Sequence, residues 1–128
     1  MTSIPAVQDK CWGDTRRIFD SAVVSVDVLN VVAGWQCSRH WHDERANRFH
    51  VVRGVVIVRS WSKDGVESVQ RLHSGHSATV ESGVLHRFEC VESGVMVEVY
   101  WPDKGGELRA ADIQRIDEGG PIPGFDQK

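Results

Sequence analysis

Two histidines separated by one residue carry the strongest chemical signal in the chain. His40 and His42 lie in a segment, residues 39–54, that is rich in charged and aromatic side chains. On an extended strand, alternate side chains point to the same face, about 7 Å apart along the chain, so both imidazoles can approach one metal ion. Taken alone, such a pair is more often solvated or hydrogen bonded. A metal site therefore requires a further ligand from elsewhere in the sequence.

A third histidine lies on a later predicted strand. His86 stands in the sequence Gly-Val-Leu-His-Arg-Phe-Glu, after a turn at Gly83. Three imidazoles from two strands would hold one divalent metal ion and leave coordination positions open, as a catalytic centre requires. Zinc, nickel, iron, manganese and copper are the candidate ions, because ligand spacing does not choose among them. His50, His73 and His76 lie outside this pattern, and we expect them to be surface or structural residues.

Five valine-rich runs supply the elements that would position these histidines. β-Branched residues pack well on a pleated sheet and lose side-chain freedom in helices, so such runs favour strands. Turn sequences containing glycine separate the runs, which predicts a β-sandwich or a β-barrel. The runs cover residues 22–32, 49–61, 66–72, 84–88 and 95–101. A short helix is expected near residues 109–116.

The last of these runs alternates between two faces. One face carries Met96, Glu98 and Tyr100, and the other carries Val97, Val99 and Trp101. We expect the valine face to form the core. Glu98 then either faces solvent or lines a polar cavity, where burial would tune it as a general base. Residues 55–58 are apolar on both faces. This pattern predicts that both faces of the strand are buried, the second one by sheet packing or by a dimer contact.

The length and composition fit one folded domain. With 128 residues, 41% hydrophobic and 26% charged, the chain can bury a single core. We expect one domain over residues 1–128, with its core in 20–103. The formal net charge of −3 argues against nucleic acid and membrane surfaces as partners. No secretory signal or membrane span is predicted, so we expect a cytoplasmic protein. The three cysteines form no CxxC pair, so we expect their thiols to be reduced; they are Cys11, Cys37 and Cys90.

The spacing around the histidines resembles the two sequence motifs of the cupin family. This resemblance implies an all-β fold, the cupin double-stranded β-helix or jelly-roll barrel, that binds a divalent metal ion. Cupins usually have a metal-binding Glu where this chain has Asn47, and Pro and Asn where it has Glu81 and Cys90. The first motif matches at Gly34, His40, His42, Asn47 and Gly54, and the second at Gly75, Glu81, Gly83, His86 and Cys90.

Asn47 leaves three interpretations of the metal site open. The centre could consist of three histidines with water or substrate in the other positions. Asn47 could instead coordinate through its neutral carbonyl oxygen, which is a weaker ligand than a carboxylate. Metal binding could also have been lost. Asp43 or Glu44 could replace the missing carboxylate, although charged residues between strands are usually solvated.

Within the cupins, the sequence looks most like a small single-domain, RmlC-like protein. More narrowly, it resembles the C-terminal cupin domain of type II mannose-6-phosphate isomerases and mannose-1-phosphate guanylyltransferases. The matching stretches are residues 10–13, 45–47, 86–89, 97–99 and 111–115. This resemblance implies a metal-dependent sugar-phosphate isomerase in which Glu98 moves a proton. Arg45 would hold a phosphate or carboxylate through its planar guanidinium, the alternative being a surface arginine.

Two other functions remain open. The same ligands would serve a three-histidine iron dioxygenase of a small substrate, which would consume oxygen. A non-catalytic module that binds a small ligand would also fit, and the loss of a carboxylate ligand at Asn47 would then mark the loss of catalysis. In each case the expected partner is a small molecule such as a sugar or sugar phosphate, and the resemblance implies a homodimer.

Overall fold

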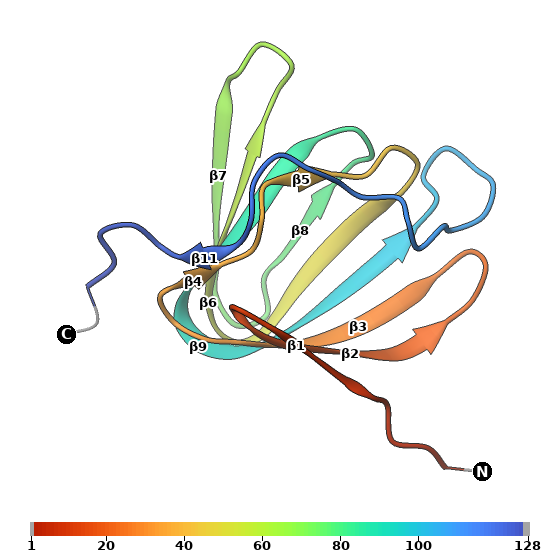
Figure 1. The fold of residues 1–128 in the computed structure, drawn as a ribbon, viewed down its shortest axis with the longest axis horizontal. Coiled ribbons are helices and arrows are strands. Elements are labelled where there is room, and N and C mark those ends of the chain that lie inside the picture. Colours follow the sequence, from red (N-terminus) through yellow and green to blue (C-terminus); the bar gives the residue numbers. More distant parts are fainter. Residues whose placement is uncertain (1, 127–128) are drawn as a thin grey trace.

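The structure, a computed structural model, describes residues 2–126 and confirms an all-β fold. Over this range the regular elements are eleven strands, with no helix that is long and apolar enough to cross a membrane. The strands form one strongly curled sheet whose two halves face each other across the interior (Figure 1). They are β1 (Val7–Lys10), β2 (Gly13–Asp20), β3 (Ser25–Val31), β4 (Trp35–Gln36), β5 (His40–Trp41), β6 (Ala46–Trp61), β7 (Glu67–Leu72), β8 (Ser77–Val80), β9 (Leu85–Trp101), β10 (Gln114–Arg115) and β11 (Gly120–Pro121).

Two long strands, β6 and β9, form the spine of the sheet. They pair antiparallel along almost their whole length, and their register shifts repeatedly between Val51 and Val56, where the strands bend. At this bend Gly54 has a φ of 95°. A Cβ added to Gly94 would lie 1.9 Å from the carbonyl oxygen of Arg53. Glycine is required where the two backbones cross so closely, and the bend lets each strand contribute to both halves of the sheet.

The bend divides the sheet into two halves. In one half, the order of neighbours is β1-β2-β3-β9-β6-β8. In the other half, β9 also pairs with β4 and β5, and β6 pairs with β7, whose hairpin projects from the body of the molecule (Figure 1). β10 and β11 come from the C-terminal part of the chain and add to β5 and β4. The C-terminal segment, in blue in Figure 1, therefore lies along β4 and β5, of which β5 carries His40.

The interior changes from apolar to polar along the central strands. Leu29, Met96 and Val51 lie in register on β3, β9 and β6, and all three are buried. Further along the same strands the buried row consists of Ser25, Tyr100 and Asn47. A closed hydrophobic core therefore fills one end of the barrel, and polar side chains fill the other. Val56 and Val58 also enter the core, so the chain itself covers the apolar run at residues 55–58.

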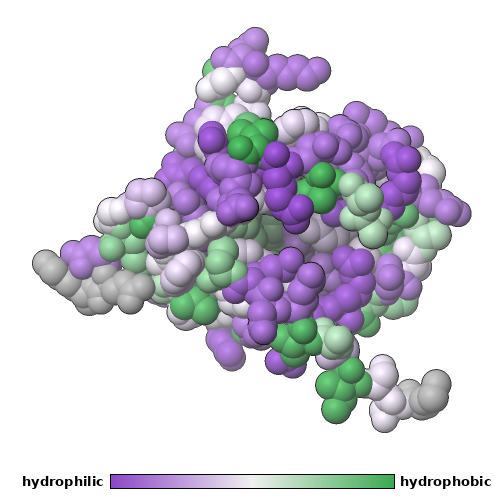
Figure 2. Space-filling view, in the orientation of Figure 1, coloured by the Kyte–Doolittle hydropathy of each residue, from purple (hydrophilic) through white to green (hydrophobic). Residues whose placement is uncertain are grey.

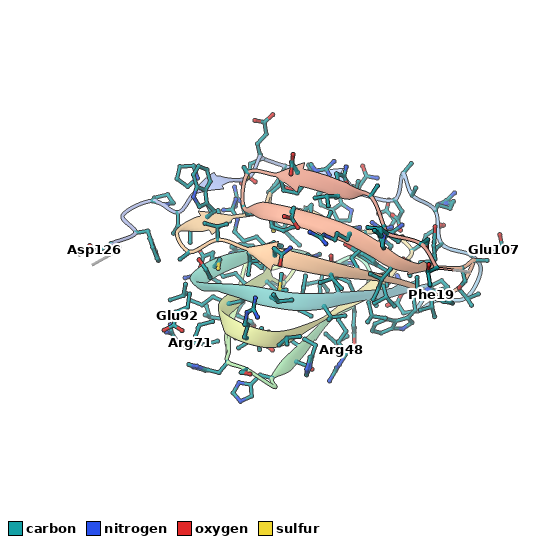
Figure 3. All side chains as sticks on the ribbon, turned by 90° about the horizontal axis from the view of Figure 1, so that it is seen from below. Phe19, Arg48, Arg71, Glu92, Glu107 and Asp126 are labelled. Carbon is teal, nitrogen blue, oxygen red and sulfur yellow. The ribbon has the colours of Figure 1, made fainter. Side chains whose placement is uncertain are left out.

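The expectation that Val97 and Val99 form the core is wrong. On β9 it is Met96, Glu98 and Tyr100 that are buried, whereas the valines are partly exposed. The reason lies in the neighbouring strand, since Val28 and Val26 stand opposite Val97 and Val99 and also face outward. Alternation alone cannot decide which face is inside when the outer face is also apolar. Figure 3 shows Phe19 and Arg48 at the periphery of the molecule.

The short helix expected near residues 109–116 is also wrong. Residues Gln114 and Arg115 form β10 and pair with Trp41 and His40 of β5, and turns precede them. An isolated helix of two turns is marginal in water, because few hydrogen bonds compensate for fixing its backbone. Pairing with β5 offers this segment hydrogen bonds that the local pattern does not predict.

Candidate metal centre

The fold brings together the three histidines that the sequence predicted. His40 on β5 is the direct cross-strand neighbour of His86 on β9. His42 follows β5 immediately. Their ring centroids lie 4.5 Å apart for His40 and His86, 5.1 Å for His40 and His42, and 5.6 Å for His42 and His86. One ligand nitrogen from each ring lies within 4.8 Å of the others, so the group could hold one metal ion.

Backbone carbonyl groups fix the orientation of all three rings. Nδ1 of His40 lies 2.8 Å from the oxygen of Ser38, and Nδ1 of His86 lies 2.8 Å from the oxygen of Val84. Nδ1 of His42 lies 2.7 Å from the oxygen of Asp112. A carbonyl oxygen can only accept a hydrogen bond, so each Nδ1 carries the proton and each Nε2 presents a lone pair. This is the arrangement in which histidine binds a metal ion through Nε2.

The histidines are also in the protonation state that metal binding requires. Burial is the largest cause that lowers their pKa, to about 4 for His40 and His42 and about 3 for His86. For His40 and His86, the neighbouring imidazole lowers the pKa further, because two cations would repel each other. All three rings are therefore neutral at neutral pH, and a metal ion does not have to displace protons from them.

Asn47 is the remaining residue that the sequence predicted as a metal ligand. Its side chain is fully buried, and its Nδ2 donates a hydrogen bond of 2.8 Å to Oε2 of Glu98. Its Oδ1 has no hydrogen-bond partner among the described residues, and neither do Nε2 of His42 and Nε2 of His86. A buried acceptor without a partner is costly, so atoms of this kind indicate a bound group that satisfies them. Nitrogen and oxygen acceptors near neutral imidazoles fit a divalent metal ion.

Glu98 is buried beside this centre. Desolvation raises its pKa to about 7, against hydrogen bonds from Tyr100 and Asn47 that lower it. The carboxyl group therefore sits close to the midpoint of its titration at neutral pH, where a side chain can both accept and release a proton. The sequence left open whether Glu98 faces solvent or a polar cavity, and the structure places it on the cavity wall.

Arg45 is buried, and its guanidinium lies 4.3 Å from the centroid of the Tyr100 ring. Within residues 2–126 it makes no ion pair with a carboxylate. Its Nε lies 3.2 Å from Nδ1 of His42, but that nitrogen already carries a proton for Asp112 and cannot accept. Its Nη1 donates to the carbonyl oxygen of Arg109 at 3.5 Å, and its charge lowers the pKa of the nearby Glu98 carboxyl. A guanidinium has several N–H donors, so Arg45 can also bind an anionic ligand.

A cavity of about 650 Å³ opens onto this group. His40, Arg45, Glu98 and Tyr100 contribute to its wall. β1, β2 and the C-terminal segment supply other lining residues, which include Gln8, Lys10, Thr15, Ile113 and Arg115. Figure 2 shows the face hollowed near its centre, with hydrophilic residues around the opening. A small polar molecule can therefore reach the side of the centre that His40 presents.

The other polar candidates lie away from the centre. Glu44 is exposed and forms an ion pair with Arg109. Asp43 is exposed and accepts a hydrogen bond from Nε1 of Trp41. Neither carboxylate replaces the missing ligand, and both positions agree with the solvated alternative. His50, His73 and His76 are exposed as expected.

Two residues of the centre were not predicted as site residues. Tyr100 shares its face of β9 with Glu98, and the sequence left open whether that face is exposed or lines a polar cavity. Asp112 holds His42 through its backbone oxygen. The stretch 111–115 had been noted only as a resemblance, and sequence spacing gives no sign that it returns to the histidines.

The fold and the site together define a class: the chain has the cupin fold and carries a three-histidine group that could bind a divalent metal ion. No protein-family model matches the sequence, and no curated protein matches it significantly. Solved structures that share the fold include oxalate decarboxylases, which are cupins. A tryptophan-to-tyrosine variant of the Bacillus subtilis enzyme superposes with a TM-score of 0.75 at 14% identity, over 88% of this chain and 30% of that one.

Two further solved structures agree with this assignment. A formate complex of oxalate decarboxylase from Lactobacillus farciminis has a TM-score of 0.73 and 16% identity, over 88% of this chain and 34% of that one. A Bacillus subtilis oxalate decarboxylase described by its Mn(II) centres has a TM-score of 0.75 and 15% identity, over 88% and 30%. This chain spans about a third of the length of these proteins. The likeness supports the cupin fold, and it does not extend to the mannose-phosphate branch.

Proposed function

We propose that this protein is a metal-dependent cupin that acts on a small anionic molecule, with a sugar phosphate as the leading substrate class. His40, His42 and His86 hold the metal ion through Nε2, and Asn47 adds Oδ1. The observation that carries this proposal is that Nε2 of His42 and Nε2 of His86 are buried without a hydrogen-bond partner among the described residues, in a three-histidine group whose ligand atoms lie within 4.8 Å of one another. A bound divalent ion would supply Lewis acidity, which polarises a carbonyl or hydroxyl oxygen of the substrate.

The residues around the ion bind the substrate and move its proton. Arg45 binds the anionic group, because its guanidinium lies at the cavity wall and has N–H donors beyond the one that bonds to the carbonyl of Arg109. Glu98 accepts a proton from the carbon next to the carbonyl and returns it to the carbonyl carbon, while the hydroxyl proton passes to the former carbonyl oxygen, as an aldose–ketose isomerisation requires. The hydrogen bonds of Asn47 and Tyr100 hold the carboxyl group in place for both steps.

The charge and size of the cavity support an anionic sugar. Neutral histidines and a neutral amide leave the charge of a dication uncompensated, and Arg45 adds to it, while Glu98 offsets part of it. Lys10 and Arg115 bring further positive charge to the wall, and Glu118 offsets part of it. Arg17 and Asp27, which also line the cavity, form an ion pair with each other. A cavity of about 650 Å³ is within the usual range for small-molecule sites.

The first test compares a ligand variant with an exposed control. We expect wild-type protein to contain close to one equivalent of divalent metal and to interconvert aldose and ketose phosphates. His42→Ala should lose the metal and at least 100-fold in turnover, because it removes a ligand. His73→Ala should match wild type, since His73 is exposed. Unchanged turnover in His42→Ala would contradict the proposal.

A second candidate is a three-histidine iron dioxygenase. The neutral ligand set favours it, because Asn47 replaces the carboxylate that would otherwise occupy the site. Oxygen consumption with Fe(II) and no isomerisation would support this alternative. Binding of a sugar phosphate without turnover under any of the candidate metals would support a non-catalytic binding protein.

We also propose that the protein is a cytoplasmic homodimer. The free thiols of Cys11, Cys37 and Cys90 support the location. The outward, partly exposed valines of β3 and β9 support the dimer, because a flat apolar sheet face is a common interaction surface.

A further inference from the structure

The metal centre is supported by a segment far along the chain. Residues 109–117, here called the C-terminal strap, lie against residues 39–45. β10 of the strap pairs with β5, and the amide of Ile116 donates to the oxygen of Arg39. Ile113 and Arg115 of the strap also line the cavity. The strap is thus both a wall of the cavity and the neighbour of two histidine ligands.

Asp112 is the residue of the strap that reaches His42. Its backbone oxygen lies 2.7 Å from Nδ1 of His42. Its carboxylate accepts the amide of Asp43 at 2.7 Å and the amide of Glu44 at 2.9 Å. The side chain is buried. One residue therefore fixes both the imidazole ring and the backbone that follows it.

His42 needs this support more than the other ligands do. His40 and His86 lie on paired strands, whose ladder fixes their backbones. His42 lies just beyond β5, in a short connection to β6, where its backbone oxygen accepts a hydrogen bond of 2.6 Å from the amide of Gly83. The amides of Asp43 and Glu44 find their acceptors in the carboxylate of Asp112 rather than in a strand. Without it they would have to find water, and the connection would gain freedom.

We propose that Asp112 is a positioning residue of the metal centre, which holds His42 in the orientation that binds the ion. This inference rests on the metal centre proposed above. Partners that orient a metal-binding histidine change metal affinity by about 10- to 100-fold when they are removed. Asp112 would act through His42 and would not touch the ion.

Asp117 provides a matched control in the same strap. Its carboxylate accepts the amide and Nε of Arg39 at 2.6 and 2.7 Å, and Nη2 of Arg87 at 3.2 Å. It also anchors the strap to the body of the protein, but it contacts none of the proposed ligands. A variant at Asp117 therefore reports the general cost of loosening the strap.

The test uses Co(II) titration of the metal-free protein, followed by the visible absorption of the bound ion. Asp112→Ala keeps the backbone oxygen that bonds to His42 and removes the carboxylate that holds the amides of Asp43 and Glu44. It should weaken Co(II) affinity by about 10-fold, the lower end of the range for such partners, and change the spectrum. Asp112→Asn, which keeps one acceptor oxygen, should lie between this variant and wild type. Asp117→Ala should keep the wild-type affinity and spectrum, while its metal-free form melts at a lower temperature.

The outcomes separate this inference from the proposed function. Wild-type affinity and spectrum in Asp112→Ala would overturn the positioning role, as would an equal loss of affinity in Asp117→Ala. If Asp112→Ala does not fold, Asp112→Asn decides, and wild-type binding in that variant would overturn the inference. A wild-type protein that binds no Co(II) would overturn the proposed function, and the role of Asp112 with it.

Discussion

Asn47 occupies the position that usually carries a carboxylate ligand in cupins, and the nitrogen and the oxygen of its amide have different roles in this protein. The amide nitrogen donates to Glu98, and the amide oxygen is buried without a partner. Sequence spacing locates this residue but cannot assign the roles of its atoms, because the partner that orients the amide lies on a different strand. A carboxylate at this position could not donate to Glu98. With Asn47 the proposed site lacks the negative charge of a carboxylate ligand, but Glu98 gains a hydrogen bond that orients its carboxyl group.

At the residue scale, this arrangement predicts the cost of removing the amide. We expect Asn47→Leu to weaken metal affinity by about tenfold, or about 1.4 kcal/mol, because a neutral oxygen is a weak ligand. The loss should be smaller than in His42→Ala. The control is Asn30→Leu, since Asn30 lies on the outer face of β3 and bonds to Asp14. Isothermal titration calorimetry with Mn(II) or Zn(II) measures the metal affinity of both variants. An unchanged affinity in Asn47→Leu would limit the residue to holding Glu98.

At the scale of the elements, the alternation of β9 was predictable and its direction was not. The period of two placed Glu98 and Tyr100 on one face, as the structure confirms. Which face is buried depends on β3 and β6, and on how the sheet curls at Gly54 and Gly94. Valine on the outer face satisfies the strand preference as well as valine in the core does. The outer valines of β9 therefore resemble core residues in the sequence, although they lie on the outer face of the sheet.

The outer face of β2, β3 and β9 predicts the surface used for dimerisation. Val28 and Val97 are cross-strand neighbours, Val26 lies opposite Val99, and all four are partly exposed. We expect wild-type protein to have the mass of two chains by light scattering, and Val97→Glu to have the mass of one, because a charge at a buried interface is costly. Val66→Glu is the control at an exposed loop valine. A wild-type monomer, or a Val97→Glu dimer, would contradict this surface.

At the scale of the whole molecule, the sequence predicted the barrel and its histidines because both depend on local patterns. Valine-rich runs predict strands, glycine turns separate them, and the spacing of His40, His42 and His86 resembles two known motifs. The C-terminal strap depends on contacts between residues far apart in the chain, such as Asp112 with Asp43. Nothing in the periodicity of residues 109–117 indicates such contacts, so the sequence predicted a helix there.

The buried histidines predict that the metal-free protein is sensitive to acid. Their pKa values of about 4, 4 and 3 lie below the ordinary value of 6.5, so between these limits the unfolded chain binds more protons than the folded one. Stability is therefore present above pH 6.5 and is lost as the pH falls. Glu98 acts in the opposite direction, because its pKa of about 7 is raised, and the folded state gains a proton as the pH falls through this range.

The net change in folding stability depends on how many groups act in each direction, three histidines against one carboxyl group. Between pH 7.5 and 5.5, each histidine contributes a loss on the order of 1 kcal/mol, and Glu98 returns somewhat more than one of these, for a net loss of about 2 kcal/mol. We expect the urea midpoint of chelator-treated protein to fall over this range. His86→Gln should reduce the fall, because it removes one of the three imidazoles that stay neutral in the folded state, whereas His76→Gln should not, since His76 is exposed. Equal midpoints at both pH values would show that the three imidazoles do not remain neutral in the folded state.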